Sequence, residues 1–230
     1  MLSPAEWSAL ELSLKVAVLS VVLSLPPALG LGLAMSRLRL HGVAVLEAML
    51  TLPLIVPPVV TGYALLALFG AHGLLGKILA AIGLPVAFRW TGAVIAAAVM
   101  AFPLLVLSVR AAFDGVDRRL EAAAETLGAG PWRRFFTITL PLSLRGVLAG
   151  AVLGFARAFG EFGATISFVG NIPGETRTLP IAIWELLNRP DGDESLARLV
   201  WVSLAVALMA SLAAGLLRAR AMPAHGVPHA

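Results

Sequence analysis

The chain has 230 residues, of which 59% are hydrophobic and 13% are charged, with a formal net charge of +4 and a mean hydropathy of +0.92. A soluble domain needs more charged surface than this composition supplies, so the sequence predicts an integral membrane protein surrounded by lipid. The pI near 10.6 would also suit nucleic acid, but the basic residues cluster at the ends of apolar segments, as topology signals do, so we expect no nucleic-acid partner.

The sequence lacks the usual ingredients of a metal site or an active site. No cysteine is present, which excludes disulfides and thiolate ligands. The expected spans supply no convergent nucleophile, base or ligand set, and no GxxxxGK phosphate loop is present for ATP hydrolysis by that route. We therefore expect no metal, no cofactor and no enzymatic activity. The four histidines, none of which are paired at a metal-ligand spacing, are His41, His72, His225 and His229.

The first two predicted spans both contain prolines. The first runs from Leu12 to Ser36 and should be kinked at Pro26 and Pro27. The second, from about Val45 to Phe69, contains a cluster of helix-breaking residues. Broken backbone at membrane depth is tolerated where it is buried in protein or lines a wet cavity, so we place this cluster beside a translocation path, with a packing kink as the alternative. Its prolines are Pro53, Pro57 and Pro58, followed by Thr61 and Gly62.

A connection from Gly70 to Trp90, with room for a short interfacial helix, leads into a third span at about Thr91 to Ala112. A polar, basic stretch follows. Within it, Leu120 to Leu127 consists of good helix formers and stops at Gly128, and Pro131 opens the next segment. This pattern predicts a short helix, a turn and a new helix.

The short helix has one acidic face and a smooth remainder. Glu121 and Glu125 lie one turn apart on the same face. The three alanines between them, Ala122, Ala123 and Ala124, leave a surface that another protein could approach closely. An ordinary solvated loop helix is the alternative.

A fourth span is expected at roughly Gly146 to Val169. Small residues recur in it every four positions and form a seam that lets two helix backbones approach closely, either within one subunit or between two copies. The seam consists of Gly146, Gly150, Gly154 and Ala158.

The same span carries two opposite charges, Arg157 and Glu161, one turn apart. Charges inside a membrane are costly, so such residues are read as partnered and functional, and these two can pair with each other. In the functional reading, Arg157 attracts an anion while Glu161 limits its grip, because a site that holds too firmly cannot release. The alternative is an ion pair that only fixes helix packing.

The remaining sequence completes a bundle of about five transmembrane helices, with a sixth left open. The apolar segment Leu179 to Leu187 is too short to span and predicts an interfacial helix, and the last span is about Leu196 to Leu217. Five spans put the termini on opposite sides. Segments 37–45, 110–145 and 218–230 hold ten basic residues against six in the opposite set, so they are expected to be cytoplasmic, with the N-terminus outside.

The polar stretch resembles the loop shared by permease subunits of type I ATP-binding-cassette (ABC) importers. The pattern of that loop is Glu-Ala-Ala, a Gly a few residues on, and then Ile-x-Leu-Pro. Gly128 and the run Ile138-Thr139-Leu140-Pro141 match it in order and spacing. Glu121 stands seven residues before Gly128 where the pattern has six, so Ala122 occupies the usual acidic place and the resemblance assigns Glu121 no particular contact.

A second stretch is more specific. From Phe159 the chain reads FGEFGATISFVGNIPGETRTLPIAIWELL, and together with the upstream FFTITLPLSL it closely resembles the permease subunit of molybdate importers, a subfamily that also handles tungstate. Sulfate importer permeases are related but less similar over Gly174 to Pro180. The likeness covers about Pro53 to Gly62 and Glu121 to Leu187.

The resemblance implies an all-α type I ABC importer permease fold in the cytoplasmic (inner) membrane. It implies a single permease domain over residues 1–220, with a cytoplasmic coupling loop at about 113–140 and a disordered tail at 221–230. The implied partners are a second copy of the chain, two cytoplasmic ATPase subunits that hydrolyse the ATP, and an extracytoplasmic oxyanion-binding protein. The implied activity is ATP-driven import of molybdate, or of tungstate, by alternating access.

Two groups of candidate residues follow, with two alternative functions. A permease for sulfate is the first alternative. An ion-gradient-driven transporter is more distant, because it would need buried acids and often internal repeats, and only Glu161 qualifies. The expected ATPase-coupling residues are Glu121, Ala122, Ala123, Ala124, Glu125, Leu127, Gly128, Ala129 and Pro141. The expected translocation path or gate consists of Pro57, Pro58, Thr61, Gly62, Arg157, Glu161 and Thr165.

Overall fold

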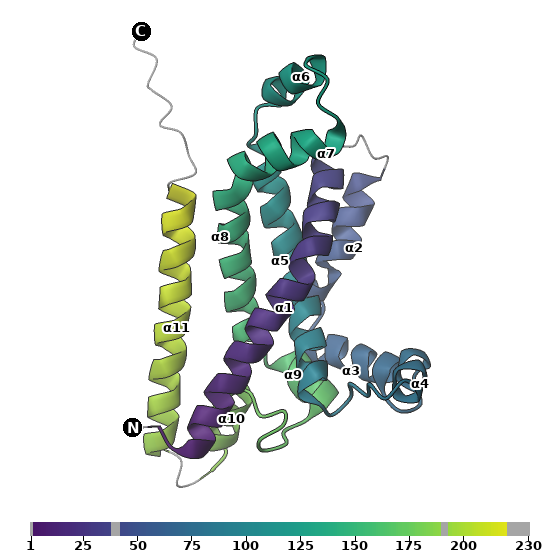
Figure 1. Cartoon of the computed structure of the whole chain (residues 1–230). Helices are drawn as coiled ribbons and strands as arrows, with labels where there is room; N and C mark the ends of the chain where they lie inside the picture. Colours follow the sequence, from purple (N-terminus) through teal and green to yellow (C-terminus); the bar gives the residue numbers. More distant parts are fainter. Residues whose placement is uncertain (1, 38–41, 190–192, 220–230) are drawn as a thin grey trace.

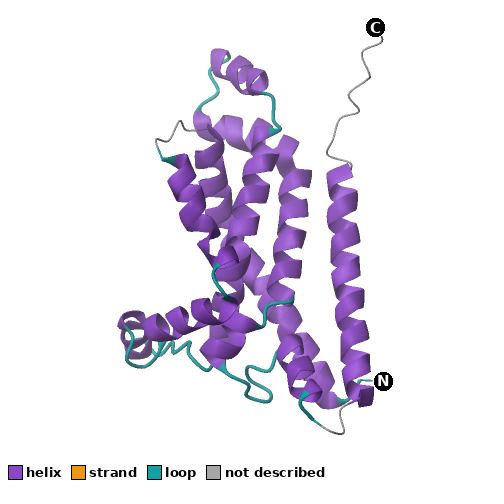
Figure 2. Cartoon of the chain, turned by 180° about the vertical axis from the view of Figure 1, so that it is seen from behind, coloured by secondary structure: helices purple, strands orange, loops and turns teal. Residues whose placement is uncertain are grey.

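The computed structural model describes residues 2–37, 42–189 and 193–219, and every regular element among them is helical (Figure 1, Figure 2). The predicted all-α class is therefore confirmed. Long helices stand side by side, and short helices lie at the two ends of the bundle (Figure 1). We call these the α6 end and the α10 end, after a short helix at each. The tail at 221–230 lies outside the described residues.

Within the described residues, four helices are long and apolar enough to cross a membrane, and one bent helix pair can supply a fifth crossing. The prediction of about five spans is confirmed in these terms. The bent pair is α2 (Val43–Ile55) with α3 (Pro58–Phe69). The four long helices are α1 (Pro4–Arg37), α5 (Trp90–Asp114), α8 (Leu140–Phe159) continuing α7 (Pro131–Arg134) and the π-helical turn η1 (Phe135–Thr139), and α11 (Asp193–Ala219).

Four short helices complete the fold. At the α10 end lie α4, α9 and α10, while α6 stands alone at the opposite end (Figure 1). Helix α10 begins and ends at the residues that bound the predicted short apolar segment. Helix α1 begins at the α10 end and α11 finishes at the α6 end, so the first and last described helices start and stop at opposite ends of the bundle (Figure 1). Their bounds are α4 (Leu74–Ala81), α6 (Arg118–Thr126), α9 (Gly163–Val169) and α10 (Leu179–Leu187).

The second span consists of two helices with a break at the cluster of helix-breaking residues, as the sequence indicated. Helices α2 and α3 meet at an angle of 103°, and the backbone of Val56 and Pro57 between them is extended, with ψ of 138° and 131°. Pro57 disfavours the helical conformation at Val56, and neither Pro57 nor Pro58 has an N–H to continue the hydrogen-bond ladder. Helix α3 therefore runs roughly at right angles to the long helices and leads away from them toward α4 (Figure 1).

The predicted bounds of the fourth span are wrong. The continuous helix starts at Pro131 and stops at Phe159, where Gly160 ends α8. Glu161 lies in the short link before α9, outside the span in which the sequence placed it. A hydropathy window misses this break because the residues of α9 are as apolar as those of α8.

The glycine seam of α8 packs on α5. A Cβ at Gly150 would lie 2.6 Å from the Cβ of Ser108, and a Cβ at Gly154 would lie 2.8 Å from the Cγ of Leu105. Gly146 faces the same helix. These distances leave no room for a side chain, so glycine is what lets the two backbones approach. Of the two contacts that the sequence left open, the seam makes the one within the subunit.

Helix α1 is held by polar contacts at the α10 end. The carboxylate of Glu6, whose side chain is 6% exposed, pairs with Arg198 of α11 at 3.1 Å. Two helical turns further along α1, the hydroxyl of Ser13 accepts a hydrogen bond of 2.6 Å from the backbone N–H of Leu179 at the start of α10. The start of α1 is thus tied to both α10 and α11.

We predict that Gly150→Ala destabilises the protein. The added methyl group would overlap Ser108 and force α5 and α8 apart, which typically costs about 1–3 kcal/mol. Gly215→Ala is the matched control, because a Cβ at Gly215 meets nothing within 4 Å. Thermal unfolding in detergent should show a lower Tm for Gly150→Ala only, and equal Tm values would contradict the packing role of the seam.

Candidate functional site

Helix α6 is short but has defined ends. At its start, the carboxylate of Asp117 accepts a backbone N–H from the first turn at 2.9 Å. At its end, the N–H of Gly128 bonds to the carbonyl of Glu125 and that of Ala129 bonds to Ala124, both at 2.9 Å. This pair of bonds is a Schellman motif, and it places Gly128 at a φ of +82° that disfavours any other residue.

The helix offers a small, smooth surface. It projects beyond α7 at the end of the bundle (Figure 1), with Ala122 and Ala123 exposed and Leu127 86% exposed. A partner covering this surface would bury one large apolar side chain among small ones. Of the predicted coupling residues, the structure gathers Glu121 to Ala129 here and places Pro141 on another helix, in the first turn of α8.

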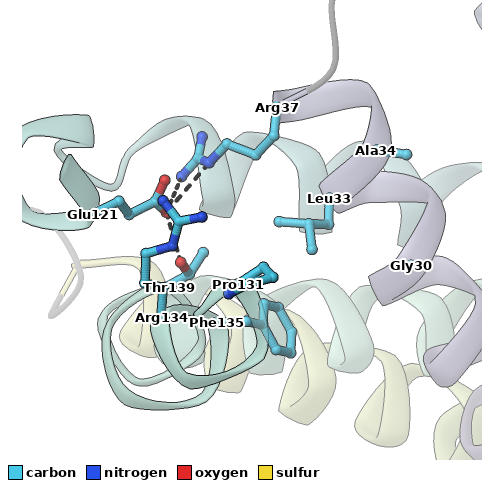
Figure 3. A pocket seen from close by; sticks show the side chains of 9 residues that line it. All are labelled: Gly30, Leu33, Ala34, Arg37, Glu121, Pro131, Arg134, Phe135 and Thr139. Carbon is cyan, nitrogen blue, oxygen red and sulfur yellow. Dashed lines mark hydrogen bonds and ion pairs between the residues drawn. The ribbon is translucent and has the colours of Figure 1, made fainter. Parts of the chain in front are cut away.

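The two acids of α6 lie on one face, as predicted, but that face is turned toward the bundle. The carboxylate of Glu121 pairs with Arg37 of α1 at 2.9 Å and accepts a hydrogen bond from the hydroxyl of Thr139 at 2.6 Å (Figure 3). Glu125 pairs with Arg134 of α7 at 2.6 Å. Both acids therefore bind within this chain, and the alanines and Leu127 are left for a partner.

The environment of Glu121 keeps its carboxylate charged. Burial raises the pKa of this carboxyl, but the hydrogen bonds from Thr139 and Arg37, with the charges of Arg37 and Arg118, outweigh burial and hold the pKa below the ordinary value of 4.5. The ion pair with Arg37 is therefore intact at neutral pH. A group with a lowered pKa stabilises the folded state above its ordinary value, and that contribution is lost as the pH falls through the lowered value.

Sequence reasoning missed Arg37 and Thr139 as partners of Glu121. It assigns Arg37 only to a basic cluster that marks topology, and Thr139 only to the Ile-x-Leu-Pro motif. Arg37 lies 84 residues from Glu121, and a single sequence holds no signal for that pairing.

A cavity lies beside these contacts. Its volume is about 480 Å³, and it opens between the end of α1 and the α7–η1 segment (Figure 3). Its walls are mostly apolar, with charged side chains among the lining residues. The cavity is lined by Gly30, Leu33, Ala34, Arg37, Glu121, Pro131, Arg134, Phe135 and Thr139.

The two helix breaks lie against each other. A Cβ at Gly62 of α3 would lie 2.5 Å from the carbonyl oxygen of Ala164 of α9, and a Cβ at Gly163 would lie 2.7 Å from the Cβ of Pro58. The starts of α3 and α9 are therefore in direct backbone contact, which only glycine permits. Thr165, on α9, is 1% exposed. The structure thus brings the two predicted groups of path residues together.

Arg157 and Glu161 form an ion pair, as predicted, with a nitrogen to oxygen distance of 2.6 Å. The other carboxylate oxygen of Glu161 accepts the backbone N–H of Ala164 at 2.8 Å, so this residue also satisfies the start of α9. The Glu161 side chain is 2% exposed and that of Arg157 is 28% exposed. The pair therefore bridges the end of α8 and the start of α9, with Arg157 on the accessible side.

A multi-pass helical bundle with two broken helices in contact and a capped helix projecting from one end has the architecture of a membrane transport component. Residues 17–221 match the family described as "Binding-protein-dependent transport system inner membrane component", and the chain belongs to this family. The match covers most of the chain and confirms the resemblance to ABC importer permeases.

Two relatives with about half of their residues identical to this chain share one name. The chain is 52% identical over 212 residues to the molybdenum transport system permease protein ModB of Escherichia coli (strain K12), covering 92% of this chain and 93% of the relative. It is 50% identical to the protein of the same name from Haemophilus influenzae, covering 90% and 91%.

Solved structures share the fold at low sequence identity. A bacterial ABC transporter involved in alginate import superposes with a TM-score of 0.73 at 16% identity, covering 94% of this chain and 80% of that one. The methionine ABC transporter MetNI, in inward-facing conformations, gives a TM-score of 0.66 at 14% identity and covers 95% of each chain. These likenesses confirm the permease fold.

We predict that Arg157→Gln destabilises the protein more than the double variant Arg157→Gln/Glu161→Gln does. The single variant leaves a buried carboxylate without its counter-charge, at a cost on the order of 3 kcal/mol. In the double variant the neutral Gln can still accept the N–H of Ala164. Thermal unfolding of both variants measures the difference, and a double variant at least as unstable as the single one would contradict it.

Proposed function

We propose that this chain is the membrane-spanning permease subunit of an ATP-driven importer that carries molybdate, and also tungstate, across the cytoplasmic membrane. The observation that carries the proposal is 52% identity over nearly the whole length to a molybdenum transport permease. The exposed surface of α6 supports it, because a permease without its own ATPase needs such a docking point. ATP hydrolysis then takes place on a separate subunit.

The proposed complex contains two copies of this chain, two cytoplasmic ATPase subunits and an extracytoplasmic oxyanion-binding protein. The family description supports the last partner, since it names binding-protein-dependent transport. The ATPase subunits dock on the alanines and Leu127 of α6. Closing on ATP swings the two permease copies from an inward-open to an outward-open arrangement.

The α6 end is placed in the cytoplasm. The basic residues support this orientation, because Arg37, Arg110, Arg118 and Arg119 all lie near that end. The start of α1 and helix α10 then lie on the outer side, where the binding protein delivers the oxyanion. Most discrimination between molybdate, tungstate and sulfate is expected at that binding protein, so a sulfate permease remains the alternative function.

The translocation path is proposed to pass the junction of α3 and α9. Backbone breaks within a membrane span are tolerated in protein interiors and along wet cavities. The partly exposed side chain of Arg157 can attract a passing dianion while Glu161 weakens its hold. The alternative is that the pair fixes the helix junction only. Near-normal uptake by Arg157→Gln/Glu161→Gln would leave that packing role alone.

We predict that Gly128→Val abolishes ATPase association and uptake while the protein still inserts. A Cβ at Gly128 meets nothing within 4 Å, so the effect comes from its positive φ, which would be lost together with the end of α6. Gly83→Val is the matched control, with φ of +77° and open space far from α6. Copurification and oxyanion uptake in vesicles measure the outcome. Uptake driven by an ion gradient in vesicles lacking any ATPase would overturn the proposed function.

We predict that a single cysteine at Leu127→Cys reacts with an impermeant thiol reagent only after the membrane is opened. The side chain is 86% exposed, and the chain has no other cysteine to report a false signal. Labelling in intact cells, compared with inside-out vesicles, measures the side on which α6 lies. Full labelling of intact cells would place α6 outside and contradict the orientation.

A further inference from the structure

The docking helix is tied to a helix that is distant in sequence. One carboxylate oxygen of Glu121 accepts hydrogen bonds from two nitrogens of Arg37, at 2.9 and 3.3 Å, and from the hydroxyl of Thr139, at 2.6 Å. Arg37 is the last residue of α1 and Thr139 ends η1. We call these three residues the latch. Charge-assisted hydrogen bonds of this length are among the strong ones in proteins.

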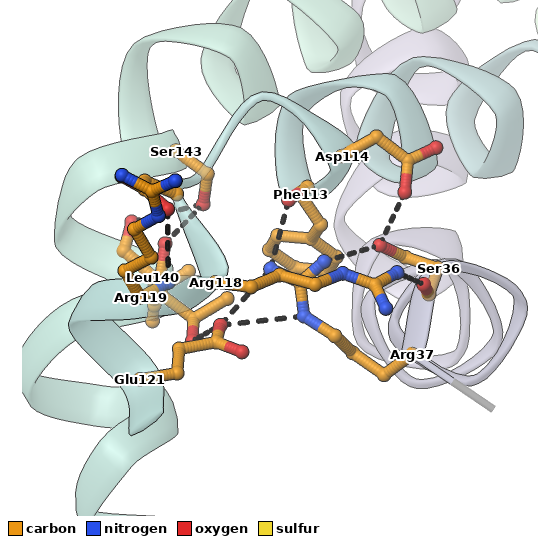
Figure 4. Close-up of polar contacts among 11 residues, drawn as sticks. Ser36, Arg37, Phe113, Asp114, Arg118, Arg119, Glu121, Leu140 and Ser143 are labelled. Atoms are coloured by element: carbon orange, nitrogen blue, oxygen red, sulfur yellow. Dashed lines mark hydrogen bonds and ion pairs between the residues drawn. The ribbon is translucent and has the colours of Figure 1, made fainter. Parts of the chain in front are cut away.

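A second set of contacts fixes the same end of α1. The guanidinium of Arg118, the first residue of α6, donates to the carbonyl oxygen of Ser36 at 2.7 Å (Figure 4). The hydroxyl of Ser36 bonds to Asp114 at 2.5 Å, and Arg37 also donates to the carbonyl of Phe113 at 2.9 Å. The last turn of α1 therefore holds both α6 and the end of α5.

The latch is polar and directional because apolar packing is interrupted at this point. The cavity of about 480 Å³ separates Leu33 and Ala34 of α1 from Pro131 and Phe135 across it, and the latch residues line it (Figure 3). Along the chain, α6 is connected only to α5 and α7. Its hold on α1 thus depends on these side chains.

At its other end, α1 is tied to α11 by Glu6 and Arg198 and to α10 by Ser13. A helix of 34 residues is about 51 Å long, which is enough to cross the membrane. We propose that the latch makes α1 move with the ATPase-docking helix, so that α1 carries the movement of α6 to the opposite end of the permease. This inference rests on the proposed function of α6, and it assigns Arg37, Glu121 and Thr139 as positioning residues that do not contact the ATPase.

The test uses the reconstituted complex of permease, ATPase and binding protein. Arg37→Ala and Glu121→Ala should each keep the ATPase bound but lower the oxyanion transported per ATP hydrolysed by about tenfold. Losing one charged hydrogen bond lowers the equilibrium constant between latched and released α1 by about this factor, and only the latched form couples hydrolysis to transport. Glu47→Gln is the matched control, since Glu47 forms an ion pair of similar length, 2.8 Å against 2.9 Å, that joins α2 to α5 and does not touch α6. It should leave the ratio unchanged.

Two further variants separate a linkage from a folding defect. The charge-swapped Arg37→Glu/Glu121→Arg should recover much of the lost coupling. Arg37→Cys/Glu121→Cys should be uncoupled when reduced and recover when a short bifunctional thiol reagent joins the two positions, because the chain has no other cysteine.

The outcomes distinguish the two proposals. Wild-type coupling ratios in the single variants, loss of ATPase binding by Glu121→Ala, or failure of both the swap and the cross-link to restore coupling would each overturn the latch. Failure of the unmodified chain to bind any ATPase would overturn the proposed function instead.

Discussion

The constraint on which this structure depends is that backbone groups released at membrane depth must find partners within the protein. The prolines at positions 57 and 58 end one helix and turn the next through 103°, and Gly160 ends another. Both interruptions lie at one place in the fold. Glycines at 62 and 163 let the two breaks touch, and the carboxylate of Glu161 accepts the N–H of Ala164.

The α3–α9 junction and the α6 end are held by different kinds of residues. The junction of α3 and α9 is built from small residues and one ion pair, which let the two backbones approach closely. The α6 end is built from arginines and acids, whose contacts have fixed directions. Between them, α5 packs against the glycine seam of α8 and has 61% of its apolar centre buried, against 17% for α11. Helix α5 also packs against α1, so it is the central helix of the bundle.

Sequence reasoning reached the features that local chemistry determines. The end of α6 follows from Gly128 and the start of α7 from Pro131, and the bounds of α10 follow from a short apolar run between polar residues. The ion pair of Arg157 and Glu161 followed from spacing alone. The prolines indicated the break between α2 and α3 but not its angle of 103°. The end of α8 was missed because hydropathy averages over a short break. The partners of Glu121 could not be predicted from the sequence, because the face that a helix turns inward depends on contacts with residues distant in the chain.

The π-helical turn η1 determines how α6 is held. Its bond from the N–H of Leu140 to the carbonyl of Phe135 adds one residue to the turn. In an uninterrupted α-helix, residues five apart would diverge by about 140° around the axis. The wide turn instead aligns Arg134 and Thr139, five apart, with Glu125 and Glu121, four apart on the facing helix. The π-helical turn thus lets the α7–η1 segment contact both acids of α6 at once. The length of this turn therefore determines the orientation of α6 relative to the bundle.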